Sequence, residues 1–395
     1  MKILVVRFRQ MGDAILATPL LSTLRANYPD AQIDFVLNER IAPLFEGHPA
    51  ISRVITFTDD ERHAPLTYIR KVWRTVHETH YDAIIDMRST LNTMLFALCS
   101  LRSRWRIGIS KPYTWAVFNR RYPGCDDDES MISHNLRLAE PLLEEREERG
   151  EGKEERGKRK EERGKRKVER NLSLSISDAE KQRFRSYMQQ QGIDFSRPVL
   201  LVGVTAKLES KTWPEDRMTT ILRRFIEAFP QWQLIFNYAP GREADNARRI
   251  RDSLPTYAAT SSQPPSHPPS QSPSQSPSQP PSQPLPVFLS IEAKSPRELA
   301  AMAANCTAYF GNEGGARHIV HAMGRPSLVV CSPSASKATW LPHDTDITAI
   351  GLSASDIRPD AAALTPREQY DLITVDRLWP LLRSFCEGLQ ETPKH

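Results

Sequence analysis

The sequence predicts an α/β fold of two Rossmann-like domains, each built around a parallel sheet. Short runs rich in β-branched residues alternate with helical patterns in both halves of the chain, and parallel strands need helical crossovers of this kind. The length of 395 residues suits two domains better than one. Two low-complexity segments interrupt the alternation, and we expect them to lie outside the sheets.

The strands of the first domain are expected in four short apolar runs. These are residues 2–8, 31–37, 53–57 and 81–87. The segment before the last run has helical spacing. Its expected core residues are Leu66, Ile69, Val72 and Val76. Another helical pattern follows the first strand and contains Pro19, which predicts a kink or an early break.

The second domain is expected to repeat this pattern with five strands. These are residues 198–204, 232–238, 286–291, 307–312 and 326–332. A helical pattern over 374–389 closes the chain. Its spacing predicts that Leu378, Leu382 and Phe385 face the core.

The low-complexity segments set the expected domain boundaries. Residues 144–170 carry 12 basic and 10 acidic side chains in heptads such as EERGKRK, which is typical of a solvated helix or a disordered linker. Residues 261–286 are rich in Pro, Ser and Gln, which favours an extended spacer. The expected units are an N-terminal domain over 1–143, the linker 144–170, a C-terminal domain over 171–373 that includes the spacer, and a closing helix and tail over 374–395.

The composition disfavours several classes of protein. No apolar run approaches the roughly 18 residues of a membrane-spanning helix. The N-terminus lacks the apolar core of a secretory signal, so we expect a cytoplasmic protein. Five cysteines without a CxxC pair favour neither a disulfide framework nor a zinc site. The net charge of +5 does not by itself indicate a nucleic-acid partner.

Candidate site residues lie at strand-to-helix turns, because the carboxyl ends of parallel strands face the ligand crevice. The first turn is RQMGD, where Gly12 permits a tight turn and Asp13 is either a helix N-cap or an acid at the crevice. In the loop after residue 204, Thr205, Lys207 and Lys211 precede a helix. These lysines either bind phosphate or are simply solvated.

Two further turns complete the candidate site. Glu243 follows a glycine at a helix start, where it either binds ribose or favours the helix. In GNEGGARHIV, Gly314 and Gly315 let the backbone approach a ligand, and the following helix offers free N–H groups to a diphosphate. Arg317 and His318 add charge or hydrogen bonds there.

Several common catalytic motifs are absent from the sequence. It contains no GxGxxG, GxxxxGK[ST], HExxH or GxSxG, which disfavours the commonest dehydrogenases, NTPases, zincins and hydrolases. Two DxD patterns, Asp126–Asp128 and Asp344–Asp346, lie in turn-like acidic loops where chance matches are common. We therefore expect no metal and no other cofactor.

Taken together and in this order, the four turns resemble glycosyltransferase family 9, the heptosyltransferases of lipopolysaccharide core assembly. The resemblance implies a GT-B architecture with the acceptor on the N-terminal domain and a nucleotide sugar on the C-terminal one. It also implies an inverting transfer from ADP-heptose to an inner-core acceptor of the Kdo-lipid A type. Pro19 then matches a proline that is usual in the family.

The resemblance also assigns roles to residues. Asp13 matches the general base, Lys211 the lysine that neutralises the diphosphate, and Glu243 the acid near the nucleoside. The sequence departs from the family at Glu313-Gly314-Gly315, where Asp-Ser/Thr-Gly is usual, so a phosphate-binding hydroxyl is missing and Arg317 is expected to compensate. This departure leaves open another nucleotide sugar, or an epimerase of the same fold.

A lipid A acceptor implies contact with the cytoplasmic face of the inner membrane. A basic and aromatic cluster fits such contact, and equally fits an ordinary domain surface or a nucleic-acid groove. Its members are Arg102, Arg104, Trp105, Arg106, Lys111, Tyr113, Trp115, Phe118, Arg120 and Arg121. A non-catalytic polyanion-binding protein, using this cluster and the charged heptads, is the alternative from another class, although the interleaved acids of the heptads argue against nucleic acid.

Overall fold

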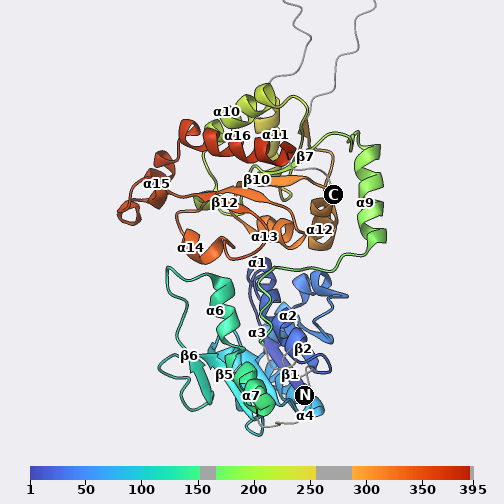
Figure 1. Ribbon diagram of the computed structural model, residues 1–395, viewed down its shortest axis with the longest axis vertical. Helices are drawn as coiled ribbons and strands as arrows, with labels where there is room; N and C mark the ends of the chain where they lie inside the picture. Colours follow the sequence, from blue (N-terminus) through green and yellow to red (C-terminus); the bar gives the residue numbers. More distant parts are fainter. Residues whose placement is uncertain (152–165, 255–286, 392–395) are drawn as a thin grey trace, which may run out of the picture.

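Two six-stranded parallel sheets form the centres of two domains, which lie one above the other in the computed structural model (Figure 1). The structure describes residues 1–151, 166–254 and 287–391. The expected spacer 261–286 and the part of the charged segment over 152–165 lie outside these residues. Among the described residues, no helix combines the length and the apolar character needed to cross a bilayer.

The N-terminal domain contains six strands and eight helical segments among residues 1–151. The strands are β1 (Lys2–Val6), β2 (Gln32–Asn38), β3 (Arg53–Phe57), β4 (Ala83–Asp86), β5 (Trp105–Ile109) and β6 (Arg120–Tyr122). The helices are α1 (Met11–Ile15), α2 (Thr18–Asn27), η1 (Glu39–Phe45), α3 (Asp59–His63), α4 (Pro65–Thr79), α5 (Leu91–Leu98), α6 (Met131–Arg137) and α7 (Glu140–Glu151). Since α7 runs through residue 144, the start of the charged segment is helical.

The C-terminal domain follows the same plan. Its strands are β7 (Val199–Gly203), β8 (Gln233–Phe236), β9 (Val287–Phe288), β10 (Ala308–Asn312), β11 (Ser327–Val330) and β12 (Ala349–Leu352). Its helices are α9 (Asp178–Gln190), η2 (Glu209–Lys211), α10 (Glu215–Ala228), α11 (Arg242–Asp252), α12 (Pro296–Ala304), α13 (Gly315–Ala322), α14 (Lys337–Trp340), η3 (Ala354–Asp356), η4 (Ala361–Ala363), α15 (Pro366–Leu372) and α16 (Val375–Glu391).

Both sheets have the strand order of a Rossmann fold. The orders are β3-β2-β1-β4-β5-β6 and β12-β11-β10-β7-β8-β9. The chain reverses direction across each sheet between β1 and β4, and between β7 and β10. In open sheets of this kind, ligands bind at the carboxyl ends of the strands beside this reversal point. The fold therefore points to the loops after β1, β7 and β10.

The nine strands expected from the sequence are all present, and three others were missed. Two of these, β5 and β6, lie within the segment interpreted as a basic and aromatic cluster. They were missed because arginines and aromatic residues interrupt their short apolar runs. β12 is a four-residue edge strand with little pattern of its own. The closing helix is confirmed as α16, and Leu378, Leu382 and Phe385 are buried in the core of the C-terminal domain.

The buried face of α4 differs from the prediction. Val72 and Val76 are buried as expected, but Leu66 is 85% exposed and Ile69 is 45% exposed. The face packed on the sheet instead begins with Tyr68, four residues before Val72. The helix carries two apolar stripes: the one with Tyr68, Val72 and Val76 packs against the sheet, and the one with Leu66, Ile69 and Trp73 is exposed.

The break predicted at Pro19 is confirmed. Helix α1 ends at Ile15 and α2 begins at Thr18, which places Pro19 in the first turn of α2, where its missing N–H costs no hydrogen bond. The tight turn expected at Gly12 is absent, because Gly12 lies inside α1 and has no positive φ.

The segment that enters the C-terminal domain is bonded along α2. The backbone N–H groups of residues 167, 169 and 173 donate to Asn27 at 3.2 Å, Thr23 at 2.9 Å and Thr18 at 3.1 Å. On the same side, Arg297 of α12 pairs with Glu180 and donates to the carbonyl of Pro43 in η1 at 3.0 Å. The two domains are thus joined by polar contacts as well as by the chain.

A close backbone contact inside the C-terminal sheet joins Gly203 of β7 to Gly311 of β10. Gly311 has a φ of +143°, and a Cβ atom there would lie 2.4 Å from the carbonyl oxygen of Gly203. The next residue, Asn312, accepts from the N–H of Trp213 at 2.7 Å and donates to the Gly203 carbonyl at 2.9 Å. This amide therefore fixes the loop after β7 against β10.

We predict that Gly311→Ala lowers the free energy of unfolding by at least about 2 kcal/mol, because the methyl group meets backbone that cannot move aside. Urea unfolding followed by circular dichroism measures this change. Gly388→Ala is the matched control, since no atom lies within 4 Å of its added Cβ, and alanine in helix α16 should be neutral or stabilising. Equal stability of the two variants would contradict the prediction.

Buried neutral histidines add a pH dependence to the fold. His48 is 2% exposed, and its ring bonds Ser173 at 3.0 Å and accepts from the N–H of Ala50 at 3.2 Å. Burial lowers the pKa of His48 from 6.5 to about 4. His321, 2.8 Å from the Thr345 hydroxyl, has its pKa lowered to about 4 for the same reason. The folded protein thus keeps both rings uncharged where the unfolded chain protonates them.

We predict that the free energy of unfolding falls as the pH is lowered from about 6.5 to about 4, because protons bind the unfolded chain first. His48→Gln should flatten this part of the curve by up to about 3 kcal/mol. Urea unfolding across this pH range tests the effect, with His63→Gln at an exposed position as the control. Parallel curves for wild type and His48→Gln would show that His48 does not contribute.

Candidate active site

Asp13 lies just beyond the carboxyl end of β1, in the first turn of α1, and is buried. Its Oδ1 atom is 3.0 Å from Nη2 of Arg7, whose Nη1 donates to the carbonyl of Met87 at 2.8 Å. Burial lowers the pKa of Arg7 to about 10, so this guanidinium stays charged near neutral pH. No described residue donates to Oδ2 of Asp13. One oxygen is therefore held and the other is open to receive a proton.

Arg7 was not among the expected site residues. The available signal was an arginine directly after the first buried strand, where a charged side chain needs a partner. Two other cations share this edge of the sheet. Arg9 lies 3.9 Å from Oδ1 of Asp13, and Arg88 donates to the Phe8 carbonyl at 2.7 Å. Burial, together with the neighbouring charge of Arg9, lowers the pKa of Arg88. This edge suits an anionic ligand.

Helix α1 faces the start of α13 across the domain boundary (Figure 1). A Cβ atom on Gly12 would lie 2.8 Å from Cδ2 of His318, and one on Gly315 would lie 2.7 Å from Cε of Met11. Gly12 is therefore needed for close approach between domains, in place of the turn expected from the sequence. The approach brings Asp13 next to the turn that begins at Gly314.

The loop after β7 and the start of α11 meet through one carboxylate. Oε2 of Glu243 accepts from the Thr205 hydroxyl at 2.9 Å and from the N–H of Ala239 at 3.3 Å. Lys211 ends η2 and is partly exposed, while Lys207 is exposed. Neither ammonium group forms an ion pair within the described part of the chain. Both positive charges are thus available to a ligand.

The turn after β10 presents the N-terminus of α13. Gly314 is its exposed N-cap, with extended backbone at a φ of 176°, and no side chain caps the helix. Glu313 is partly buried, and its Oε2 accepts from the N–H of Ser332 at 2.9 Å. The free N–H groups of an eight-residue helix and its dipole favour an anion at this end.

Arg317 does not compensate for the missing hydroxyl in this structure, contrary to the expectation. Its side chain is fully buried, and Nη2 donates to the Trp340 carbonyl at 2.7 Å and lies 2.9 Å from Nε2 of His318. Burial and the adjacent guanidinium lower the pKa of His318 well below its ordinary value. His318 is therefore an uncharged packing partner of Gly12. The guanidinium of Arg317 is buried against the Trp340 carbonyl.

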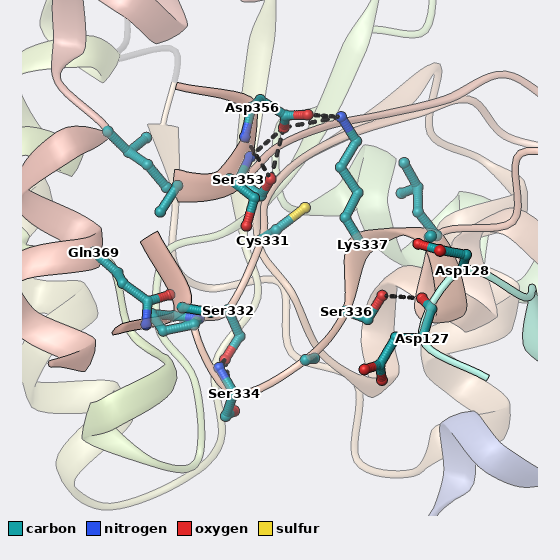
Figure 2. A pocket seen from close by; sticks show the side chains of 18 of the residues that line it. Asp127, Asp128, Cys331, Ser332, Ser334, Ser336, Lys337, Ser353, Asp356 and Gln369 are labelled. Carbon is teal, nitrogen blue, oxygen red and sulfur yellow. Dashed lines mark hydrogen bonds and ion pairs between the residues drawn. The ribbon is translucent and has the colours of Figure 1, made fainter. Parts of the chain in front are cut away.

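A polar cavity of about 950 Å³ opens beside this turn, at the carboxyl ends of β11 and β12 (Figure 2). Ser332, the partner of Glu313, lines it, and Lys337 crosses it to pair with Asp356 at 2.8 Å. Ser336 donates to the carbonyl of Asp127 in the N-terminal domain at 2.7 Å. The cavity therefore flanks the residues expected to bind the donor, and its serines were not foreseen from the sequence.

The acidic pattern Asp344–Asp346 joins the domains. Oδ2 of Asp344 accepts from the hydroxyls of Ser130 at 2.9 Å and Ser133 at 3.1 Å. It also pairs with Arg170 at 2.6 Å. The carboxylate is occupied by donors from the N-terminal domain and the segment that follows it. Of the other pattern, Asp127 and Asp128 line the polar cavity.

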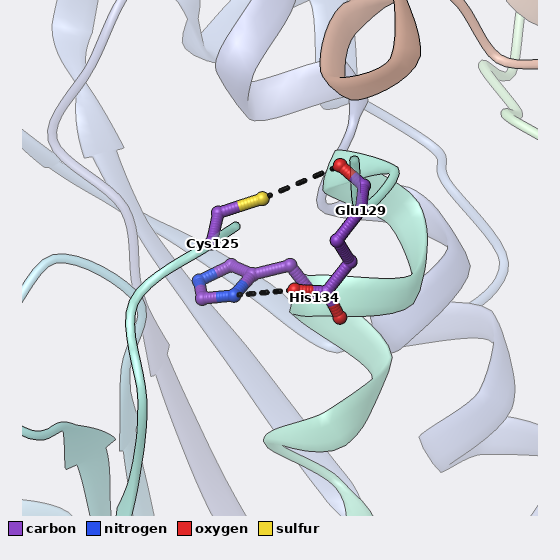
Figure 3. A group of neighbouring side chains, drawn as sticks. All are labelled: Cys125, Glu129 and His134. Carbon is purple, nitrogen blue, oxygen red and sulfur yellow. Dashed lines mark hydrogen bonds and ion pairs between the residues drawn. The ribbon is translucent and has the colours of Figure 1, made fainter. Parts of the chain in front are cut away.

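Cys125, Glu129 and His134 bring three side chains of metal-binding type together (Figure 3). Nη2 of Arg137, however, lies 2.6 Å from Oε2 of Glu129 and 3.2 Å from Nδ1 of His134. Burial raises the pKa of the Cys125 thiol to about 11 and, with Arg137, lowers that of His134 to about 4. A guanidinium thus already occupies the position that a metal ion would take.

The basic and aromatic cluster expected at residues 102–121 is only partly a surface. Phe118 is buried in the core, and Trp105 donates from its indole to Glu145 at 2.9 Å. Tyr113 and Trp115 are the exposed aromatics, at 45% and 69%. All three of Tyr113, Trp115 and Phe118 lie in the connection between β5 and β6, and of these only Phe118 is buried.

Comparison with known proteins agrees with this geometry. The model of the family described as "Glycosyltransferase family 9 (heptosyltransferase)" matches residues 69–261. Lipopolysaccharide heptosyltransferase 2 of Escherichia coli K12 is 22% identical over 86% of the chain and 85% of its own length. A glycosyl transferase family 9 structure from Veillonella parvula has a TM-score of 0.70 at 15% identity, covering 99% of this chain and 97% of that one.

A further solved structure carries a ligand in its name. It is an E. coli heptosyltransferase with ADP-2-deoxy-2-fluoro heptose, with a TM-score of 0.60, 15% identity, and coverage of 97% of this chain and 99% of that one. In this chain the two Rossmann-like domains meet where α1, which carries Asp13, approaches the start of α13. The motifs at these turns occur along the chain in the order expected from the sequence. The chain belongs to glycosyltransferase family 9 and is a glycosyltransferase of GT-B architecture.

Proposed function

We propose that this enzyme transfers a heptosyl unit from ADP-heptose to an inner-core acceptor of the Kdo-lipid A type, with inversion at the anomeric carbon. The observation that carries the proposal is the Asp13 carboxylate, held by Arg7 opposite the N-terminus of α13. The relative named as a lipopolysaccharide heptosyltransferase and the structure named with an ADP-heptose analogue support this donor and acceptor.

On the acceptor side, the reaction needs a base beside the attacking hydroxyl. Oδ2 of Asp13 takes the proton as the acceptor oxygen attacks the anomeric carbon and the bond to the diphosphate breaks. A single displacement of this kind inverts the configuration. Arg7 fixes the carboxylate through Oδ1 and leaves Oδ2 free. Arg9 and Arg88 favour an acceptor that carries carboxylate or phosphate groups.

On the donor side, the leaving ADP carries the developing negative charge. We place its diphosphate at the N–H groups of α13, with Lys211 and Lys207 as counter-charges and without a metal ion. Glu243, which accepts a hydrogen bond from Thr205, follows β8, the neighbour of the strand β7 that precedes the two lysines. At this position its carboxylate suits a ribose hydroxyl.

The Glu313-Gly314 pair bears on the identity of the donor sugar. Glu313 is tied to the backbone of Ser332, which holds its carboxylate toward β11, and Gly314 offers no hydroxyl to the ligand. A site with one donor fewer discriminates less strongly between sugars. A transferase that uses a different nucleotide sugar is therefore the second candidate.

Mass spectrometry of the product tests the proposal. Purified enzyme, ADP-heptose and a Kdo-bearing lipid A acceptor are incubated with chelator, and the expected result is the gain of one heptosyl unit. Transfer from another nucleotide sugar but not from ADP-heptose would favour the second candidate. Absence of any transfer by folded protein, across a panel of nucleotide sugars, would contradict both.

We predict that Asp13→Asn lowers the turnover number by about 10² to 10⁴ fold, because the amide cannot accept the proton. The shape of the side chain is kept, so the affinity for ADP, measured by isothermal titration calorimetry, should stay within about threefold, well under the 1.4 kcal/mol of a tenfold change. Near-normal turnover of this variant would remove Asp13 from the mechanism.

We predict that Arg7→Met lowers kcat by about 10-fold to 100-fold with little change in the KM for the donor, since a charge-assisted hydrogen bond to the base is lost. Arg7→Lys should recover part of this loss. The matched control is Arg40→Met, because Arg40 forms an exposed ion pair with Asp59 outside the site. Steady-state kinetics with both substrates checks the prediction, and equal kcat values for Arg7→Met and wild type would contradict it.

A further inference from the structure

Exposed apolar side chains gather on one part of the N-terminal domain. Eleven large apolar side chains of the described residues are exposed, and eight of them lie between residues 66 and 115. We call these eight the apolar face. They are Leu66, Ile69, Trp73, Leu91, Leu98, Leu101, Tyr113 and Trp115. Such a concentration on one surface of a water-soluble fold indicates a contact with an apolar partner.

The members of this face lie on neighbouring elements. The Tyr68 hydroxyl of α4 donates to the carbonyl of Asn92 in α5 at 2.9 Å, and the inward sides of both helices belong to one core cluster. Their outward sides therefore point away from the sheet together. The Tyr113 hydroxyl donates to the Ser89 carbonyl at 3.3 Å, which places the loop that also carries Trp115 beside the start of α5.

The same segment accounts for the net positive charge of the protein. Residues 64–121 contain ten basic and three acidic side chains, a net charge of +7, whereas the whole chain has +5 and the remainder is therefore slightly acidic. Of the three acids, Asp86 is fully buried and Glu78 lies 3.6 Å from Arg74. Arg70 and Arg102 form no ion pair within the described residues, and both are exposed. Arg70 and Arg102 thus place unpaired guanidinium groups next in sequence to the exposed Ile69 and Leu101.

The face also leads toward the acceptor side of the active site. Tyr113 contacts the carbonyl of Ser89, and the preceding residue, Arg88, donates to the carbonyl of Phe8. Phe8 lies in the segment that leads through Arg9 to Asp13 in α1. A ligand held at the apolar face would therefore have its polar end near the general base.

We infer that the apolar face docks the enzyme on the surface of a bilayer that contains anionic phospholipid. Leucine, isoleucine and tryptophan side chains enter the headgroup region, while arginines between them contact lipid phosphates. A nucleic acid would meet the same charge, and its bases could stack on the aromatic rings, but it would leave the five exposed aliphatic side chains in water. The inference deepens the proposed function, since a lipid-linked acceptor is presented at such a surface, but its test does not depend on sugar transfer.

Sedimentation with sucrose-loaded vesicles tests the inference on the full chain. Vesicles of equal parts phosphatidylcholine and phosphatidylglycerol should bind the enzyme, and vesicles of phosphatidylcholine alone should bind it at least about tenfold more weakly. The Ile69→Glu/Trp73→Glu double variant should lose about tenfold or more in partitioning onto the anionic vesicles. The matched control, Val168→Glu, changes an exposed apolar residue outside the face and should bind as wild type does.

Three results would overturn the inference: equal binding to both kinds of vesicle, unchanged binding of the double variant, or conversion of a wild-type dimer to a monomer by the double variant in light scattering. The last would assign the face to a second copy of the chain. Thermal unfolding followed by circular dichroism shows that the variants are folded. Transfer to a deacylated, soluble acceptor without vesicles should be equal for wild type and the double variant. If the proposed function is wrong, neither protein will transfer sugar in this assay, whatever their binding to vesicles.

Discussion

The architecture of the site depends on how closely α1 approaches α13. A single methyl group on Gly12 would overlap the ring of His318, and one on Gly315 would overlap Met11. Because these backbones come so near, the carboxylate of Asp13 and the open N-terminus of α13 share one narrow space although they belong to different domains. The ring of His318 is part of the same packing, and its burial, with the adjacent Arg317, lowers the pKa of His318 well below its ordinary value.

Electrostatics divides this space into two functional sides. Arg7, Arg9 and Arg88 lie near Asp13 on one side. Lys207, Lys211 and the α13 terminus offer positive charge on the other. Positive charge on both sides attracts the two substrates, each of which is anionic in the proposed reaction. In the proposed mechanism, the oxygen of Asp13 that pairs with Arg7 fixes the orientation of the carboxylate, and the other oxygen accepts the proton.

The sequence was sufficient for the features that local pattern decides. The strands that lead to Asp13, Thr205 and Glu313 were predicted because buried parallel strands are nearly continuous apolar runs. The buried face of α4 could not be predicted, because the helix has two apolar stripes and only contact with the sheet determines which of them is buried. Gly12 and Arg317 were misread for a related reason, since their roles depend on partners in another element. The acidic pattern at Asp344 is likewise understood only once Ser130 is seen beside it.

That contact at Asp344 has a consequence for how the two halves separate. Three donors from the first half of the chain converge on one oxygen, while the other oxygen of the same carboxylate is buried without a partner. Loss of any one donor leaves a charged group more poorly paired, so the stability of the carboxylate then depends more strongly on the remaining bonds. Separation of the two halves at this edge therefore requires that one carboxylate, on a single side chain, be released by all three donors.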